Sequence, residues 1–348
     1  MAGGEERRRR AAAATSTATM ADVAELAGVS AQTVSRVLRQ PHSVSETTRR
    51  KVHEAIRASG YVPNRAASHL ASNQSHTVAA ILPVLSASVF ADTMQAASAV
   101  LSPAGYQIQL GYTDYRTSTE EDLIRNFLGW RPDGFFIVGA LHTPAAAAML
   151  RSADVPIVET WGWSDQPLDL LVGFSNRRAV ADLVRALVAK GHEKLAFAGV
   201  LAPGDERAAE RRAGFTEVVE ELFPGQPLRI VNMAEEPVAM RTGRKLLERV
   251  VGDHPDVTAA VFSSDIFAAG AVLSAKRLGI DVPADLAITG FGDFEISAML
   301  EPALTTVAID AEAIGARAAE ILLDRMRGEE PPARQLDVGY TIRMRDSA

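Results

Sequence analysis

Nine short apolar runs, separated by stretches with the periodicity of amphipathic helices, occupy most of this chain. The runs cover residues 77–82, 106–110, 134–138, 155–158, 170–174, 195–199, 228–231, 259–262 and 286–290, and a last strand is expected at 338–343. Such alternation predicts parallel β-sheets covered by helices on both faces. Nine strands are many for one sheet, so we expect a break within 174–194 and two similar lobes, with ligands bound between their strand ends.

A different pattern precedes the first run. Residues 1–18 have no apolar periodicity and predict a flexible extension. Thr19 stands three residues ahead of Asp22, which resembles a capping box, and Val23, Leu26 and Ala27 then form one apolar stripe. This pattern predicts a short first helix.

A second and a third helix follow. Gly28 permits a left-handed turn, and Ser30 is placed to cap a helix over about 31–38, whose buried positions would be Val34, Val37 and Leu38. Two short helices joined by such a turn make a helix-turn-helix. The third helix would run from the Ser45 cap to residue 59, with Gly60 as its stop signal. Residues 64–70 could form about two further helical turns, too few to be stable alone in water.

Charge is divided unevenly along the chain. The net charge is −7, yet residues 1–76 carry +5 and the remainder −12. A basic N-terminal module can bind the phosphates of nucleic acid, whereas the acidic remainder of the chain is repelled by them.

Several classes of protein are disfavoured. The chain has no Cys, which excludes disulfides and Cys-ligated metal sites and suits a reducing cytoplasm. No apolar run approaches the ~20 residues that span a bilayer, and the N-terminus lacks the apolar core of a secretion signal. The P-loop, nucleophile-elbow and zincin motifs are absent, and Gly290-Phe-Gly292 lacks the third glycine of a dinucleotide fingerprint. We therefore expect neither an enzyme nor a cofactor or metal.

The segment from Met20 to Leu38, followed by Val44-Ser45 and Gly60-Tyr-Val-Pro-Asn64, resembles the DNA-binding signature of LacI-type transcriptional regulators. The resemblance continues in Lys190-Gly-His192, Arg211-Arg-Ala-Gly-Phe215, Ser264-Asp265 and Pro302-Ala-Leu-Thr-Thr306. It implies an all-α helix-turn-helix domain joined to an α/β periplasmic-binding-protein-like core of two Rossmann-like lobes, with three chain crossings and side-by-side dimers. No leucine-heptad helix follows the last strand, so we expect a homodimer.

The domain bounds follow from the pattern and the resemblance together. We expect the extension over 1–18, the helix-turn-helix domain over 19–63, a hinge helix and linker over 64–76, and the core over 77–348. Lobe one would take about 77–175 and 305–330, and lobe two about 176–304 and 331–343.

In a helix-turn-helix the second helix enters the major groove, where Gln can pair with adenine and Arg with guanine. Gln32 and Arg36 are therefore the candidates for base readout, and Ala31 offers at most a methyl contact. The resemblance adds Leu70 as an apolar wedge in the minor groove, with packing against the core as the alternative. The full set of expected DNA contacts is Thr19, Ser30, Ala31, Gln32, Thr33, Ser35, Arg36, Ser45, Asn64, Ala67 and Leu70. For the hydroxyl and amide side chains, a phosphate contact competes with helix capping or a solvated surface position.

The core should bind a small polyol or sugar acid, which needs aromatic faces, paired polar groups and a cation for any carboxylate. The resemblance places Arg211 at the sugar-contacting position of the family. The expected effector residues are Phe90, Asp114, Glu159, Phe174, Arg211, Ser264 and Asp293, with core packing as the alternative for the two Phe and a surface ion pair for Arg211. Many relatives read Gly-Phe-Asp-Asp where this chain reads Gly290-Phe-Gly-Asp293, and loss of the first Asp favours an acidic ligand.

Val89-Phe-Ala91, His142-Thr-Pro144 and Val172-Gly-Phe174 resemble the gluconate-repressor branch. We therefore expect a cytoplasmic, nucleoid-associated repressor of carbohydrate catabolism genes that binds palindromic double-stranded operator DNA and is controlled allosterically by a sugar acid. A regulator of the same family that responds to a neutral sugar or another metabolite is the alternative. A second alternative, from a different class of protein, is a cytoplasmic solute-binding protein.

Overall fold

The computed structural model describes residues 18–62, 74–85 and 87–348, apart from the side chain of Pro41. The chain divides into two compact units, with the division between Gln74 and Ser75. The predicted hinge positions Asn64, Ala67 and Leu70 lie outside the described residues, as does the predicted extension except for its last residue.

The N-terminal unit consists of α2 (Met20–Ala27), α3 (Ala31–Arg39), the 3₁₀ turn η1 (Pro41–Ser43) and α4 (Glu46–Ser59). A capping box starts α2, because the Thr19 side chain accepts from the Asp22 N–H while the Asp22 carboxylate accepts from the Thr19 N–H. Gly28 (φ 65°) makes the left-handed turn before α3, and Gly60 (φ 65°) ends α4 in the same conformation. The predicted helix-turn-helix is therefore confirmed.

The core of this unit is made by small and β-branched side chains, with Val23, Val34 and Val52 fully buried. The prediction that Leu26 shares the buried stripe is wrong, since its side chain is 62% exposed. Ala24 and Ala27 complete the buried face of α2, and Leu26 lies roughly 100° around the helix from the centre of that face.

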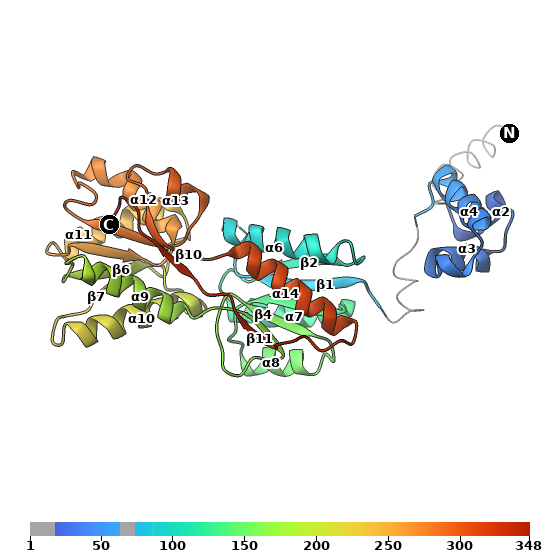
Figure 1. Cartoon of the computed structure of the whole chain (residues 1–348), viewed down its shortest axis with the longest axis horizontal. Coiled ribbons are helices and arrows are strands. Elements are labelled where there is room, and N and C mark those ends of the chain that lie inside the picture. Colours follow the sequence, from blue (N-terminus) through green and yellow to red (C-terminus); the bar gives the residue numbers. More distant parts are fainter. Residues whose placement is uncertain (1–17, 63–73, 86) are drawn as a thin grey trace, which may run out of the picture. The chain divides into compact units, whose positions relative to one another are not determined.

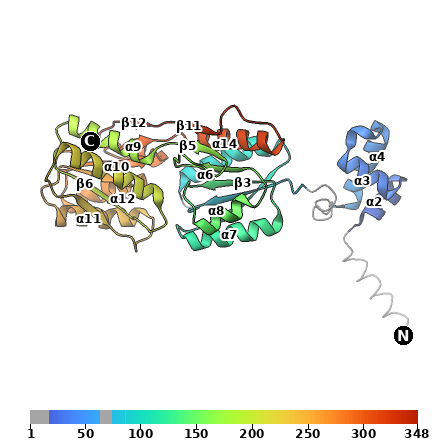
Figure 2. The same cartoon turned by 90° about the horizontal axis from the view of Figure 1, so that it is seen from below.

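The core unit contains two sheets of the same topology, which form two α/β lobes (Figures 1 and 2). The sheet of lobe one has the order β11-β5-β4-β3-β1-β2 and is wholly parallel. Its strands are β1 (Thr77–Leu82), β2 (Gln107–Tyr112), β3 (Gly134–Val138), β4 (Ile157–Thr160), β5 (Leu170–Gly173) and β11 (Gln335–Asp337).

The sheet of lobe two has the equivalent order β12-β10-β9-β8-β6-β7, with β12 antiparallel to β10. Its strands are β6 (Leu195–Gly199), β7 (Arg229–Asn232), β8 (Ala259–Phe262), β9 (Ala287–Gly292), β10 (Thr305–Ala308) and β12 (Thr341–Arg343). All nine apolar runs form strands. In both sheets the strand order reverses beside the first strand of the lobe, and ligands of open α/β sheets bind at such a point.

Helices cover both faces of each sheet. In lobe one, α6 (Ser88–Leu101) and α14 (Ala311–Met326) pack together, and α7 (Thr117–Trp130) contacts α8 (Pro144–Arg151). Alternate residues of β1 serve the two faces: Val78 and Ala80 pack with α6 and α14, whereas Ala79 and Ile81 pack with α7 and α8.

Lobe two repeats this arrangement. It pairs α9 (Asn176–Ala189) with α10 (Glu206–Leu222), and α11 (Met240–Asp253) with α12 (Asp265–Ala275). The 3₁₀ turn η2 (Lys276–Leu278) and the short helix α13 (Glu295–Met299) complete the lobe.

The predicted lobe bounds need correction near the C-terminal end. Strand β10 belongs to lobe two and β11 to lobe one, the reverse of the predicted assignment, so the chain crosses after β5, β10 and β11. Strand β10 escaped prediction because its buried Thr305 and Thr306 look polar, yet their hydroxyls donate to the Arg345 carbonyl and the Asp265 carboxylate. The predicted last strand is broken at Gly339 (φ 69°), whose N–H donates to Asp337.

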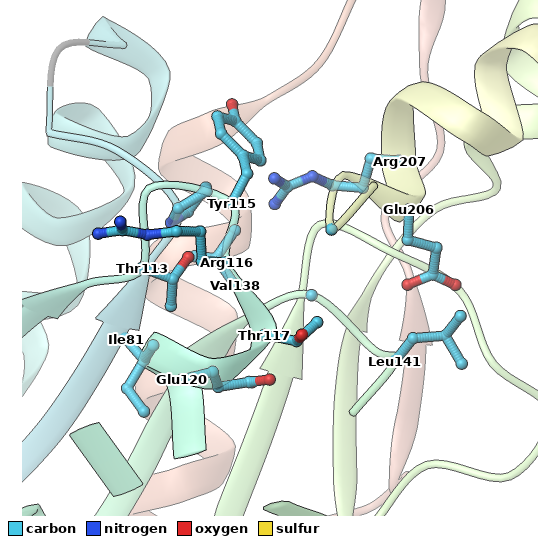
Figure 3. A pocket seen from close by; sticks show the side chains of 13 residues that line it. Ile81, Thr113, Tyr115, Arg116, Thr117, Glu120, Val138, Leu141, Glu206 and Arg207 are labelled. Carbon is cyan, nitrogen blue, oxygen red and sulfur yellow. The ribbon is translucent and has the colours of Figure 1, made fainter. Parts of the chain in front are cut away.

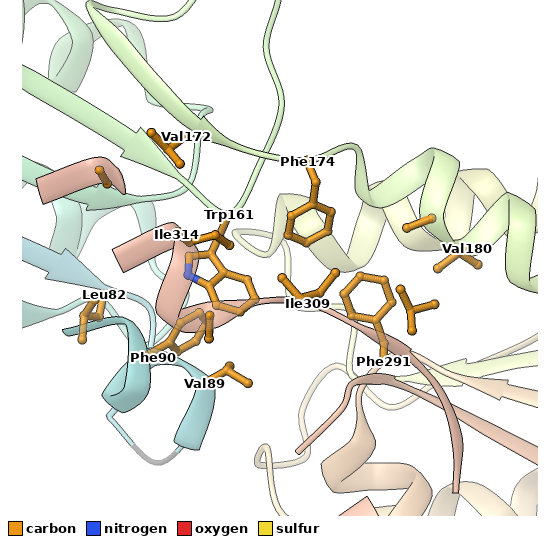
Figure 4. Packing of buried hydrophobic residues seen from close by; sticks show 14 of the residues in the cluster. Leu82, Val89, Phe90, Trp161, Val172, Phe174, Val180, Phe291, Ile309 and Ile314 are labelled. Carbon is orange, nitrogen blue, oxygen red and sulfur yellow. The ribbon is translucent and has the colours of Figure 1, made fainter. Parts of the chain in front are cut away.

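One apolar cluster runs from lobe one into lobe two (Figure 4). Four of its aromatic residues, Phe90, Trp161, Phe174 and Phe291, contact one another in that order, with successive ring centroids 5.4, 6.1 and 6.1 Å apart. Burial of such rings contributes both area and edge-to-face attraction. The lobes are thus joined by packing as well as by the crossing segments.

A buried ionic cluster links three elements at the strand ends of lobe one. His142, in the loop after β3, places Nδ1 2.7 Å from Glu120 Oε1 of α7 and Nε2 3.2 Å from Glu159 Oε1 of β4. Glu159 also accepts from the Leu168 N–H at 2.6 Å. Burial alone would lower the pKa of His142, but the hydrogen bonds and charges of the two carboxylates outweigh it and raise the pKa to about 9.

This cluster makes the stability of the core depend on pH. The folded-state pKa of His142 exceeds its ordinary value of 6.5, so its contribution is fully present below about pH 6.5 and is lost as the pH rises through about 9. The free energy of unfolding should fall by about 3 kcal/mol across this range. Urea unfolding of the core at about pH 7.5 and 9.5 should show most of the loss, and His142→Gln should abolish it.

The matched control is His254→Gln, because His254 makes no ion pair within the described part of the chain. It should keep the parental pH dependence. If the free energy of unfolding depends on pH equally in the parent and in His142→Gln, the ionic role of the cluster is contradicted.

Candidate functional site

The exposed face of α3 carries the side chains predicted to read bases. Ala31, Gln32 and Arg36 are exposed, while Val34 and Val37 on the opposite face hold the helix against its unit. Among the described residues, the Arg36 side chain has no hydrogen-bond or ion-pair partner. Its guanidinium is therefore available to a partner outside the chain.

The predicted phosphate-binding hydroxyls already have structural roles. Ser30 and Ser45 cap α3 and α4, accepting from the N–H groups of Thr33 and Thr48 at 3.1 and 3.4 Å. The Ser30 and Thr33 hydroxyls lie 2.9 Å apart, and Ser35 accepts from Arg39. Together with the capping box at Thr19, these bonds favour the capping alternative, although the exposed hydroxyls keep lone pairs for further contacts.

A cleft lies where the loops at the strand ends of the two lobes face each other. Lobe one contributes Phe90, Tyr115 and Trp161, and lobe two contributes Arg207 and Arg211. The remaining lining residues include Val200, Asp205, Ser263, Ser264, Phe267, Phe291 and Phe294. Three of the predicted effector residues, Phe90, Arg211 and Ser264, thus come together in this effector cleft.

Arg211 lies on α10 with its guanidinium over the ring of Phe291, 4.6 Å from the centroid. One terminal nitrogen donates to Asn176 Oδ1 at 2.9 Å. The Nε atom is buried without a hydrogen-bond partner among the described residues. Burial lowers the pKa of Arg211 to about 10, which leaves it charged at neutral pH but poorly solvated.

Arg207, which the sequence analysis missed, lies one helical turn before Arg211. Its guanidinium is 5.4 Å from the Phe90 centroid and 5.9 Å from that of Tyr115, and 3.7 Å from the Asp205 carboxylate. Arg207 is only 8% exposed, and one terminal nitrogen has no partner within the described residues. The i, i+4 spacing on a predicted helix was the signal that could have found it.

Trp161 and Asn176 connect the two sides of the cleft. The Trp161 backbone lies in the left-handed region (φ 65°), and its carbonyl accepts from Asn176 Nδ2 at 3.0 Å. Its indole N–H donates to Thr93 of α6 at 3.2 Å. Asn176 therefore holds Arg211 with one end of its amide and the lobe-one chain with the other.

Four predicted effector residues lie elsewhere. Phe174 is fully buried between Trp161 and Phe291 and packs rather than lines the cleft. Glu159 is hydrogen-bonded to His142, and Asp114 is exposed in the loop after β2.

Asp293 is held by two arginines of the last segment. Its oxygens lie 2.9 Å from Arg343 Nε and 2.6 Å from an Arg345 terminal nitrogen, and it does not line the effector cleft. A negative charge that is already paired offers little to a ligand, so the structure does not bring Asp293 into the site.

Ser264 precedes α12 without capping it, so its hydroxyl has no bond within the described chain and is open to a ligand. Burial and the nearby Asp205 raise the pKa of Tyr115 to about 12, so its hydroxyl stays protonated and can donate. The cleft thus offers two guanidinium groups and the hydroxyls of Tyr115, Ser263 and Ser264 against one carboxylate. These groups suit recognition of a small anionic polyol.

The described side chains include no cluster of His, Asp and Glu in a geometry that could hold a metal ion. None of the described helices has the length and apolar character that crossing a bilayer requires.

Comparisons with known proteins agree with this architecture. Residues 19–64 match the family of bacterial regulatory proteins, lacI family, and residues 184–348 match the periplasmic binding protein-like domain. The HTH-type transcriptional regulator GntR of Pseudomonas aeruginosa is 37% identical over 334 residues, which cover 96% of this chain and 96% of that protein.

Two solved structures are similar over nearly the whole chain. A LacI-family transcriptional regulator from Silicibacter pomeroyi is 36% identical, with a TM-score of 0.88 over 95% of this chain and 99% of that one. The lac repressor dimer bound to operator and the anti-inducer ONPF is 26% identical, with a TM-score of 0.81 over 95% and 99%. The chain therefore belongs to the lacI family of bacterial regulatory proteins, and it is a DNA-binding transcriptional regulator rather than an enzyme.

Proposed function

We propose that this regulator is a homodimeric repressor of genes for the catabolism of gluconate or a related sugar acid. It would act on operator DNA in the cytoplasm and be controlled by the acid in the effector cleft. One observation carries the choice of ligand: Arg207 and Arg211 each bury an N–H that lacks a hydrogen-bond partner among the described residues.

A buried donor without a partner costs about 1–3 kcal/mol, and more when it is charged. A carboxylate would satisfy such donors with charge-assisted bonds, and a guanidinium can hold it in a bidentate pair. The two arginines face one carboxylate, Asp205, which leaves one positive charge in the cleft uncompensated. A ligand with a single negative charge balances the site.

The aromatic side chains support the same choice. Neutral sugar rings are commonly bound with their C–H surfaces against aromatic faces. Here Phe90 and Tyr115 face the guanidinium of Arg207, and Phe291 faces that of Arg211. These rings stabilise the two cations that we propose bind the carboxylate of the ligand.

Dimer formation is supported by exposed apolar side chains in both lobes. A groove between α6 and the edge strand β2 is lined by Met94, Ile108 and Leu110, and Leu110 is 51% exposed. In lobe two, Leu273 and Met299 are 57% and 80% exposed. Burial of such side chains against a second copy would stabilise an isologous dimer, and a two-fold dimer suits a palindromic operator.

Control by the ligand follows from where the cleft lies. An acid bound to lobe-two arginines and lobe-one aromatic residues would favour one arrangement of the lobes over the other. The coupling free energy is then the difference between the affinities of the two arrangements for the acid. We expect residues 64–70 to transmit this change to the DNA-binding unit, a prediction that lies outside the described residues.

The first prediction concerns base readout by α3. Arg36→Ala should weaken binding to each half-site by about 1–3 kcal/mol and relax the preference at one base pair, because a bidentate contact to guanine is lost. Selection of binding sites from random duplexes measures both effects. Arg57→Ala on α4 is the control for loss of one positive charge in the same unit, and it should keep the base preference. An unchanged preference in Arg36→Ala would refute the assignment.

The second prediction concerns Arg211. Arg211→Ala should bind operator like the parent but no longer respond to gluconate, because the main anchor for the carboxylate is lost. Arg211→Lys should restore only part of the response, since an ammonium lacks the planar fork. Fluorescence anisotropy of labelled operator with and without D-gluconate measures the response, and calorimetry measures binding of the acid.

The neighbouring Arg212→Ala is the matched control, because Arg212 is exposed on the same helix and does not line the cleft. It should respond like the parent. If the parent binds neutral sugars and no acid, the proposed ligand class is wrong, and if Arg211→Ala responds normally, Arg211 does not hold the ligand.

A further inference from the structure

A second compartment adjoins the effector cleft. It shares Tyr115 and Arg207 with the cleft and is lined in addition by Thr113, Thr117, Glu120 and Glu206 (Figure 3). We call it the polar compartment. Its two walls come from opposite lobes, since Glu206 and Arg207 begin α10 of lobe two and the other residues belong to lobe one.

The rim between the two lobes is tight here. An added Cβ at Gly204 would lie 1.9 Å from the Tyr115 carbonyl oxygen, so the lobe-two loop presses against lobe-one backbone beside the compartment. The two lobes are therefore closely packed beside the compartment.

Polar groups of three kinds line this space. Thr113 and Thr117 offer hydroxyls, Glu206 offers a carboxylate, and Arg207 offers the buried N–H that lacks a partner. In Figure 3 the Glu206 side chain extends from α10 toward Leu141, while the Arg207 guanidinium extends toward Tyr115. Donors and acceptors of this kind match the hydroxyl groups of a polyol.

Glu206 is the group in this compartment that a ligand would meet as an acceptor. It makes no ion pair and no side-chain hydrogen bond among the described residues. Its neighbour Glu120 already accepts from His142. Burial raises the pKa of Glu206 to about 7, which reflects a carboxylate that is poorly solvated and has no donor of its own.

Among the described residues, two cations line this compartment, and neither forms an ion pair with Glu206. Arg207 lies beside Asp205, and the exposed Arg116 extends its guanidinium away from Glu206 (Figure 3). A phosphate group beside Glu206 would add about two negative charges close to that carboxylate, and Arg207, whose charge is shared with Asp205, would offset them only in part. Like-charge contacts of this kind are a means of excluding a wrong ligand.

We propose that Glu206 is a specificity-determining residue, which admits the hydroxyl end of a sugar acid into the polar compartment and excludes an acid phosphorylated at that end. This inference rests on the proposed function, because it takes the carboxylate of the acid to be held at Arg211. Glu206 accepts a hydrogen bond from a ligand hydroxyl, and the same charge repels a phosphate.

The test compares two acids that differ only in the phosphate at the far end. D-Gluconate and 6-phospho-D-gluconate are titrated into the full chain by calorimetry at about pH 8, where the phosphate is doubly charged and Glu206 is ionised. The parent should bind gluconate at least about tenfold more tightly than the phosphorylated acid. Glu206→Gln should reduce that ratio about tenfold, because an amide can still accept from a hydroxyl but does not repel a phosphate.

Two further variants separate charge from other effects. Glu206→Asp keeps the charge and should keep the preference for gluconate, whereas a ratio as low as that of Glu206→Gln would contradict the electrostatic account. Glu217→Gln removes the same charge from an exposed position of α10 and should leave the ratio unchanged. Thermal unfolding of each variant checks that the core is intact.

The outcomes distinguish this inference from the function on which it rests. If the parent binds neither acid, the proposed sugar-acid function fails. If the parent binds both acids equally, or if Glu206→Gln keeps the parental ratio, the function stands and the role of Glu206 is overturned.

Discussion

The structure depends on two guanidinium groups kept out of water between the lobes of the core. Burial of a charge is costly unless it is paired, and here the pairing is partial. Asp205 lies beside Arg207, Asn176 accepts one bond from Arg211, and aromatic rings face both cations. Cation–π contacts of this kind contribute about 2 kcal/mol or more when desolvated, whereas burying an ion costs several kcal/mol, so they offset part of the cost. The shortfall is what a bound anion can supply.

The contacts that hold these arginines come from both lobes, so the binding site and the joint between the lobes are the same structure. Asn176 bonds to Arg211 and to the Trp161 carbonyl, and the Trp161 indole bonds to Thr93 on α6. Thr93 also donates to the Ala311 carbonyl at the start of α14. A ligand that changes the position of Arg211 must therefore strain or release contacts that reach the helices covering the lobe-one sheet. Coupling through such two-sided contacts needs no separate relay.

Most of the fold could be predicted because it follows from local patterns of apolarity and capping. Every apolar run forms a strand, and Gly28, Ser30 and Gly60 mark helix ends as expected. Strand β10 was missed because buried threonines bonded to distant groups look polar in the sequence. The site was harder for the same reason: whether Glu159 or Asp293 faces a ligand depends on His142 and Arg345, which the sequence does not reveal as partners. Arg207 could have been found from its spacing to Arg211.

The two units use their polar side chains differently. The small unit uses its hydroxyls to cap helices and fills its core with valine and alanine, so few side chains on α3 remain unpaired. The base readout that we propose for α3 would therefore rest on a small number of exposed side chains, which suits a short half-site. The core differs, since two of its unpaired buried donors belong to Arg207 and Arg211, which line the effector cleft. Exposed donors can meet a macromolecule at little desolvation cost, whereas buried donors discriminate strongly between ligands that satisfy them and ligands that do not. In the function we propose, the same residue type, arginine, serves base readout on α3 and ligand selection on α10 because of where each helix places it.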